Sequence, residues 1–177
     1  MNPAPDTRKS ALVVVVPDAE PVVGRWRALL DPSAGREMPA HITVLYPFAP
    51  ATMVSDALVA RATEAVGRCR AFEFSLPSTG WFDDRVVFLA PEPVEPFLAL
   101  TAAITSAFPD FPPSGAFVDP VPHLTLGRGH ETDRLRQAGR DVQSQLPVRS
   151  TVREVSLMIR GRDTGLWGTR ARLLLRE

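Results

Sequence analysis

The chain has 177 residues, 45% hydrophobic and 23% charged, which suits one ordinary globular domain with a sizeable core. Twenty acidic residues balance twenty Lys and Arg, and this zero net charge disfavours proteins that coat long nucleic acids. A single cysteine, Cys69, excludes an intrachain disulfide and a zinc site built from several cysteines. No apolar run reaches the roughly 20 residues that span a membrane. We therefore expect a cytoplasmic protein, and we expect it to act as a monomer.

Strands and helices alternate along the first half of the chain, according to the period of the apolar residues. The expected elements are a buried strand over 12–16, a helix over 19–30, an alternating strand over 41–45, a helix from Thr52 or Ser55 to about 69, a strand over 72–76, and turns at 77–80 and 83–84.

The second half repeats this order. The expected elements are a strand over 86–89, a helix over 96–108, a Pro-rich loop over 109–122, a strand over 123–126, a helix over 132–146, and two closing strands over 152–159 and 166–175.

This repetition predicts an α+β protein with a duplicated, bilobal fold in a single domain over residues 1–177. The repeats are expected at about 11–84 and 85–177, each with an antiparallel-rich sheet and with helices on the outside. Lobes this short are not stable alone, so they either share one sheet system or pack tightly face to face.

Two of the three histidines begin the same motif in a predicted strand, His41-Ile-Thr43 and His123-Leu-Thr125, 82 positions apart (123 − 41). Residues i and i+2 of a strand point to the same face, so each His shares a face with its Thr. One such motif carries little information, because His on a strand is usually structural and Thr favours strands. Two copies at equivalent places of a repeat indicate a functional pair.

A pair of histidines suits the cleavage of a phosphodiester. In-line displacement requires one group to take a proton on one side of phosphorus and another to give a proton on the other side. Histidine does either near neutral pH. The two Thr hydroxyls, on the same face, suit donation to the non-bridging phosphate oxygens. This chemistry needs no metal, and we expect no cofactor.

The segments His41-Ile-Thr-Val-Leu-Tyr-Pro-Phe48 and His123-Leu-Thr-Leu-Gly-Arg128 resemble the paired motifs of the two-histidine (2H) phosphoesterases. That superfamily includes 2′–5′ RNA ligase-like proteins and cyclic nucleotide phosphodiesterases, and the resemblance covers nearly the whole chain. It implies that the motifs face each other across a central cleft, that the two His are acid and base, and that the two Thr bind the phosphate. Arg128 matches a basic position often found after the second motif.

Several aromatic residues are candidates for substrate binding. Tyr46 follows the first motif, Trp81 and Trp167 lie at or near predicted hairpin turns, and Phe111 and Phe117 precede the second motif in the Pro-rich loop. For the Tyr and the two Trp, stacking on a nucleobase and packing against the protein both remain open. The two Phe are candidates for one wall of the cleft.

The predicted function is metal-independent hydrolysis of a 2′,3′-cyclic phosphate or 2′–5′ phosphodiester, with ligation possible in reverse. Zero net charge favours a small nucleotide or an RNA terminus as the partner over a long nucleic acid. Two alternatives stay open: a non-catalytic module that binds nucleotides or RNA ends, and a metal site that uses both histidines. The metal site lacks an obvious third ligand. The third histidine, His130, is expected at the surface.

Overall fold

The computed structural model describes residues 8–113, 115 and 118–177, which form eight strands and four α-helices. The strands are β1 (Ser10–Val15), β2 (His41–Leu45), β3 (Phe72–Phe82), β4 (Val86–Glu92), β5 (Leu124–Arg128), β6 (Val148–Val152), β7 (Glu154–Arg160) and β8 (Trp167–Leu174). The helices are α1 (Glu20–Leu30), α2 (Asp56–Gly67), α3 (Glu95–Ala107) and α4 (Thr132–Gln143).

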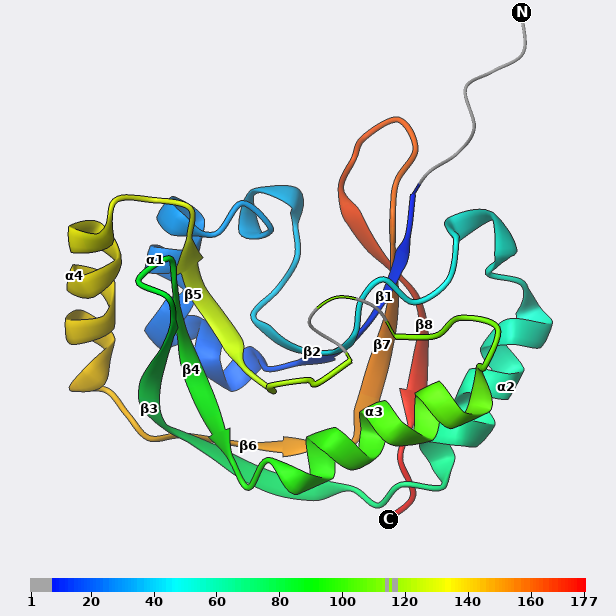
Figure 1. Ribbon diagram of the computed structural model, residues 1–177. Coiled ribbons are helices and arrows are strands. Elements are labelled where there is room, and N and C mark those ends of the chain that lie inside the picture. The colour runs from blue at the N-terminus through cyan, green and yellow to red at the C-terminus, as the bar shows by residue number, and fades with distance from the viewer. Residues whose placement is uncertain (1–7, 114, 116–117) are drawn as a thin grey trace, which may run out of the picture.

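All eight strands belong to one curled sheet in the order β6-β3-β4-β5-β2-β1-β7-β8, and all neighbours are antiparallel (Figure 1). The predicted α+β class with antiparallel pairing is confirmed, and the halves share one sheet. Strands β3 and β4 pair although they come from different predicted repeats, and β7 and β8 extend the sheet beyond β1. The repeat boundaries at 11–84 and 85–177 stay a prediction.

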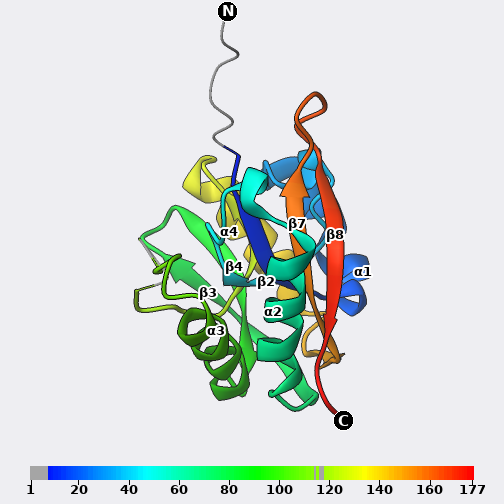
Figure 2. The same cartoon turned by 90° about the vertical axis from the view of Figure 1, so that its right-hand side faces the viewer.

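The helices cover one face of this sheet. Helices α1 and α4 pack on the half that contains β4 and β5, and α2 and α3 pack on the half that contains β2 and β8 (Figures 1 and 2). Alternate strand residues such as Val14, Ile42 and Leu124 face the helices and are buried in one large apolar core. No helix in the described part of the chain is long and apolar enough to cross a membrane.

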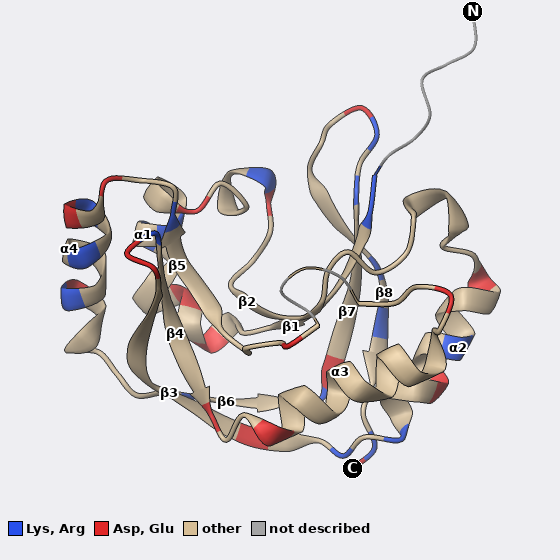
Figure 3. Cartoon of the chain, viewed as in Figure 1, with Lys and Arg blue, Asp and Glu red and all other residues tan. Residues whose placement is uncertain are grey.

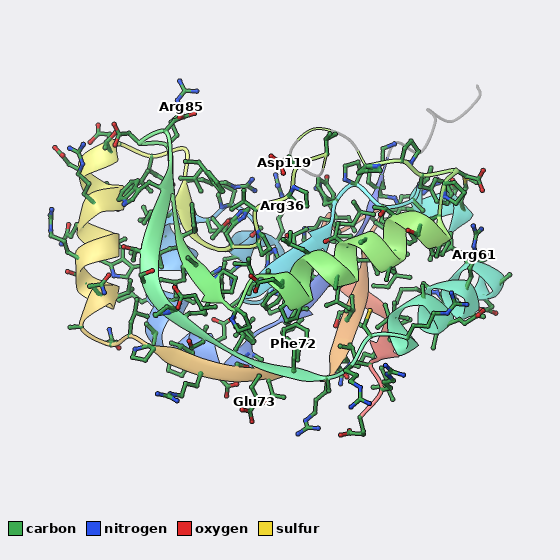
Figure 4. The ribbon with its side chains drawn as sticks, turned by 60° about the horizontal axis from the view of Figure 1, so that its bottom comes forward. Arg36, Arg61, Phe72, Glu73, Arg85 and Asp119 are labelled. Carbon is green, nitrogen blue, oxygen red and sulfur yellow. The ribbon has the colours of Figure 1, made fainter. Side chains whose placement is uncertain are left out.

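Several local predictions are confirmed. Strand β2 has the predicted bounds, and Ser55 caps α2 by accepting the backbone N–H of Leu58 at 3.3 Å. The turn at Asp83 and Asp84 has two successive residues with positive φ, 46° and 43°, as a tight hairpin turn requires. In this turn, Arg85 points away from the rest of the molecule (Figure 4).

The strands differ from the prediction in two places. The expected turn at 77–80 does not form, because β3 continues from Phe72 to Phe82 with an irregular register between Ser75 and Ser78 that accommodates Pro77. The strand expected over 152–159 corresponds to β7, but the prediction missed β6 just before it, which pairs with β3 at the other side of the sheet. The sequence of β6, Val-Arg-Ser-Thr-Val, is too polar and short to have a strong strand signal.

Candidate active site

The central strands β2 and β5 bring the two His-x-Thr motifs together. Ile42 is paired with Leu124 in antiparallel register, and both side chains face the helices. Extending this register by one residue either way sets each His beside the Thr of the other motif, with the two His diagonal at roughly 7–8 Å. We call the sheet face that carries these side chains the histidine face: His41, Thr43, His123 and Thr125.

Both imidazole rings are oriented by the backbone two residues earlier. Nδ1 of His41 lies 2.7 Å from the carbonyl oxygen of Pro39, and Nδ1 of His123 lies 2.7 Å from that of Val121. A carbonyl oxygen only accepts, so each Nδ1 carries a proton and donates it. Nε2 of each neutral ring therefore keeps a lone pair, which suits it to accept a proton from a substrate.

The protein strongly disfavours the charged form of His41. Burial of the ring lowers the pKa of His41 from 6.5 to about 4, and the positive charge of Arg27 acts in the same direction. The hydrogen bond to Pro39 and the carboxylate of Asp31 oppose this shift. His41 is thus neutral near pH 7. A bound phosphate would favour the protonated ring and raise this pKa.

A buried ion pair in and after α1 braces the segment that leads into the first motif. The side chains of Arg27 and Asp31, both almost fully buried, meet at 3.0 Å. Arg27 also donates to the carbonyl oxygen of Met38 at 3.0 Å and lies 3.5 Å from Oε1 of Glu20. The same Glu20 oxygen accepts the backbone N–H of Ala40 at 2.6 Å. The backbone just before the first histidine is therefore tied to α1 at two points.

Asp31 remains charged in this buried place. Burial alone would raise its pKa, but hydrogen bonds from Ser33 and the charge of Arg27 hold the pKa of Asp31 below its ordinary value. Ser33 donates its hydroxyl at 2.7 Å and its backbone N–H at 3.0 Å. Oδ1 of Asp31 also lies 3.8 Å from Nε of Arg128, which is half-exposed at the end of β5. One carboxylate thus links the support of the first motif to the arginine that follows the second.

His123 has aromatic neighbours in place of buried charges. The ring centroids of Phe82 and Phe88 lie 4.9 and 5.2 Å from that of His123. Burial lowers the pKa of His123, and the charge of Arg128 adds to this effect against the backbone hydrogen bond. Gly80 is paired with Phe88 and leaves room for its ring, since a Cβ on Gly80 would lie 2.4 Å from it.

The remaining predicted residues separate into three places. Tyr46 is exposed and meets Trp167 edge-to-face, with ring centroids 6.2 Å apart. Trp81 is paired with the buried Val87 and faces α4, on the opposite side of the sheet from the histidines. Phe117 lies outside the described residues. Phe111 packs against the apolar core instead of forming a wall of the site.

Sequence reasoning missed four side chains around the motifs. Phe88 appeared as part of a uniformly buried strand, and Phe82 appeared beside Trp81 without a sign of which ring faces the histidines. Arg27 and Asp31 looked like ordinary residues at a helix end. Their spacing of four is the one available signal, because it places both on the same side of a helix.

Residues that could hold a metal ion do not gather at this site. Within the residues that the structure describes, no three His, Cys, Asp or Glu side chains are placed to hold one. His130 is exposed, as expected, and lies outside the two motifs.

The family model of the 2′-5′ RNA ligase superfamily matches residues 15–164, most of the chain and both motifs. The chain belongs to this superfamily. Its members are 2H phosphoesterases, so the resemblance seen in the motifs is confirmed at the level of the family. No curated protein sequence matches the chain significantly.

Solved structures with the same fold cover almost the whole chain. E. coli LigT complexed with 3′-AMP has 19% identity and a TM-score of 0.61, with 96% of this chain and 99% of that chain covered. The protein TT0787 of Thermus thermophilus has 19% identity and a TM-score of 0.64, with 95% and 98% covered. A structure described as a phosphoesterase has 22% identity and a TM-score of 0.60, with 96% and 99% covered. At these identities the likeness establishes the shared fold.

Proposed function

We propose that this protein opens the 2′,3′-cyclic phosphate, or cleaves a related 2′–5′ phosphodiester, of a small nucleotide or an RNA end without a metal ion. The observation that carries the proposal is the cross-strand pairing of the motifs, with both Nδ1 atoms held by backbone carbonyls. E. coli LigT has been solved with 3′-AMP, ATP and NADP+, which supports nucleotides as the ligand class. A cytoplasmic location stays a prediction.

In ring opening, a water oxygen attacks phosphorus and the bond from phosphorus to one ribose oxygen breaks. The neutral Nε2 of one histidine takes the proton from water. The protonated Nε2 of the other histidine gives its proton to the departing ribose oxygen, so the pair ends with its protonation exchanged. The bound phosphate supplies the negative charge that lets one ring carry a proton despite the lowered pKa of both His41 and His123.

Negative charge develops on the non-bridging phosphate oxygens during this step. The hydroxyls of Thr43 and Thr125 share the histidine face and are suited to donate to these oxygens. Arg128, at the end of β5, adds a positive charge near the same place. Removing one such donor in other enzymes costs about 10²–10³ in rate. Thr43→Val and Thr125→Val should each lower kcat by about that factor.

The test is incubation with nucleoside 2′,3′-cyclic phosphates in the presence of EDTA, with ring opening followed by phosphorus NMR or chromatography. We expect turnover in EDTA and a loss of about 10²–10⁴-fold in His41→Ala and in His123→Ala. His130→Ala is the matched control, because this exposed histidine lies outside the motifs. Its activity should equal that of the unaltered protein.

Other outcomes would assign another function. Tight binding of cyclic nucleotides without turnover, over a panel of cyclic and 2′–5′ substrates, would indicate a non-catalytic module that binds nucleotides or RNA ends. Activity that EDTA abolishes and zinc restores would indicate a metal site. Joining of RNA ends with a 2′–5′ bond would show that the same groups also work in the ligation direction.

A further inference from the structure

The apolar part of the histidine face continues beyond the motifs toward β8. Val13 of β1 is paired with Thr43 on one side and with Ser156 of β7 on the other. Val13 also belongs to a small buried cluster with Ala11, Met38 and Met158, against which Trp167 packs. This buried cluster therefore joins the strand of the first motif to Trp167 across β1 and β7.

A hollow of about 470 Å³ lies beyond Trp167 at the β7–β8 hairpin. It is bounded by both strands of the hairpin, by the start of β1 and by the segment before β2. Its lining includes Arg8, Glu37, Arg160, Trp167, Thr169 and Arg170. The hairpin extends beyond the main body of the sheet (Figures 1 and 2).

The lining of this hollow is positively charged. Three arginines face one acid, Glu37, among the described residues that line it, whereas the whole chain has a net charge of zero. Figure 3 shows Lys and Arg along the hairpin and the neighbouring start of the chain. Arg160 donates Nε to the carbonyl oxygen of Gly165 at the hairpin turn at 3.2 Å, and Arg170 forms an exposed ion pair with Asp56 at the start of α2.

This hollow is too far from the motifs to receive the phosphate that lies between the histidines. Crossing from β2 to β8 takes three strand spacings of about 4.8 Å, or roughly 14 Å along the sheet. A cyclic mononucleotide has one phosphate, so it cannot place a negative charge both at the histidines and in the hollow. A nucleic-acid strand has a phosphate in every nucleotide and bases that stack on aromatic rings.

We propose that the hollow beside Trp167 binds further nucleotides of a single-stranded RNA whose cyclic phosphate end lies at the two histidines. The proposal rests on the proposed function, because it takes the histidine pair as the place of the terminal phosphate. An unpaired base stacks on the half-buried ring of Trp167, and Arg160 and Arg170 contact the phosphates. The preferred substrate is then an RNA end of several nucleotides, and the cyclic mononucleotide is a poorer one.

The experiment compares kcat/KM for cyclic-phosphate substrates of increasing length, from the mononucleotide to about six nucleotides. For the unaltered protein, kcat/KM should rise about tenfold or more as the substrate lengthens, and this rise should disappear as the salt concentration increases. Trp167→Ala, and separately the double variant Arg160→Gln/Arg170→Gln, should lose about fivefold or more of the gain and leave the rate on the mononucleotide unchanged. Arg68→Gln/Arg153→Gln is the charge-matched control for the arginine pair, because both residues are exposed, pair with Glu64 and Glu177, and do not line the hollow.

Each outcome decides the proposal. Equal kcat/KM at all lengths, or a length gain that both variants retain, would overturn it. The mononucleotide rate reports folding and the chemistry of the histidines, so its loss in His41→Ala concerns the proposed function alone. If Trp167→Ala proves unstable, Trp167→Phe should keep most of the length gain and Trp167→Leu should lose it, and equal behaviour of these two would also overturn the proposal.

Discussion

The two His-x-Thr motifs have the same backbone geometry but different surroundings. Each ring donates Nδ1 to the carbonyl two residues earlier, at 2.7 Å in both cases. The first ring lies near the buried charges of Arg27 and Asp31, and the second lies against the rings of Phe82 and Phe88. The repeat therefore duplicates the position of the imidazole, while the neighbouring elements decide its proton affinity.

This difference has a consequence for a reaction that needs one acid and one base. Two histidines in equal surroundings would compete for one proton equally. Here burial, to which the charges of Arg27 and His123 add and which Asp31 opposes, lowers the pKa of His41 to about 4, whereas burial among rings and the more exposed Arg128 lower that of His123. The unequal surroundings make the two rings distinguishable before any substrate binds.

The largest expected effect follows from breaking the ion pair beside the first motif. Arg27→Met leaves the buried carboxylate of Asp31 without its buried cationic partner, which costs about 3–5 kcal/mol of unfolding free energy. Urea denaturation measures this loss. Arg68→Met, which removes an exposed pair with Glu64, should cost less than about 1 kcal/mol.

A double variant sharpens this test. Arg27→Met combined with Asp31→Leu removes both charges, and should regain much of the stability because apolar replacements of buried pairs are often neutral. The segment before His41 would still lack the hydrogen bond to Met38, so activity should stay low. Equal stability of Arg27→Met and Arg68→Met would contradict a buried pair that braces the first motif.

The next largest effect is a loss of folding stability at acidic pH. His41 is neutral in the folded protein down to about pH 4 but becomes protonated near 6.5 when unfolded, so the unfolded state binds more protons between these values. Folding stability should thus be complete above about pH 6.5 and fall toward pH 4, by at most about 3 kcal/mol for this group. The lowered pKa of His123 acts in the same direction.

Urea midpoints measured between pH 7 and 4 check this prediction. In His41→Gln the decline should be shallower, because the group that resists protonation is gone. His130→Gln should reproduce the decline of the unaltered protein, since His130 is exposed. A decline of the same steepness in His41→Gln would sink the assignment of the acid sensitivity to this ring.

The sequence predicts the shared geometry of the motifs better than their different surroundings. Apolar and polar residues alternate along β2 and along the strand after His123. This pattern can be seen in a few neighbouring residues, and it correctly predicts which of them face the core. The pairing of β2 with β5 was expected only as two lobes that meet, because contacts across 82 residues leave no local pattern. The buried role of Arg27 depends on the backbone of Met38, which no side-chain pattern shows.

The same reason explains the misplaced aromatic residues. Trp81 and Phe82 are adjacent, so in a continuous strand they must face opposite sides. The Pro-Ser-Thr-Gly segment before them resembled a turn, and the expected break removed the alternation that would have distinguished them. Only the pairing of β3 with β4 decides that Phe82 and not Trp81 lies against His123.

A smaller effect is expected from filling the space beside the second motif. A Cβ on Gly80 would lie 2.4 Å from the ring of Phe88, so Gly80→Ala must displace a ring that packs on His123. Overpacking of this kind costs about 1–3 kcal/mol. Gly35→Ala is the matched control, because no atom lies within 4 Å of its added Cβ. In the double variant Gly80→Ala/Phe88→Leu most of the lost unfolding free energy should return. An unchanged loss would show that contact with the ring of Phe88 is not its cause.

The smallest effect tests the aromatic surroundings directly. Phe82→Ala opens one side of His123 to water, and because burial is the main cause of its lowered pKa, that pKa should rise toward the ordinary value. NMR titration of the histidine ring protons measures the change, and the pKa of His41 should move less, because His41 senses His123 only through its charge. One limb of the kcat/KM profile against pH should shift to higher pH together with the pKa of His123. An equal upward shift of both pKa values would contradict the prediction, because the rings of Phe82 and Phe88 lie against His123 alone.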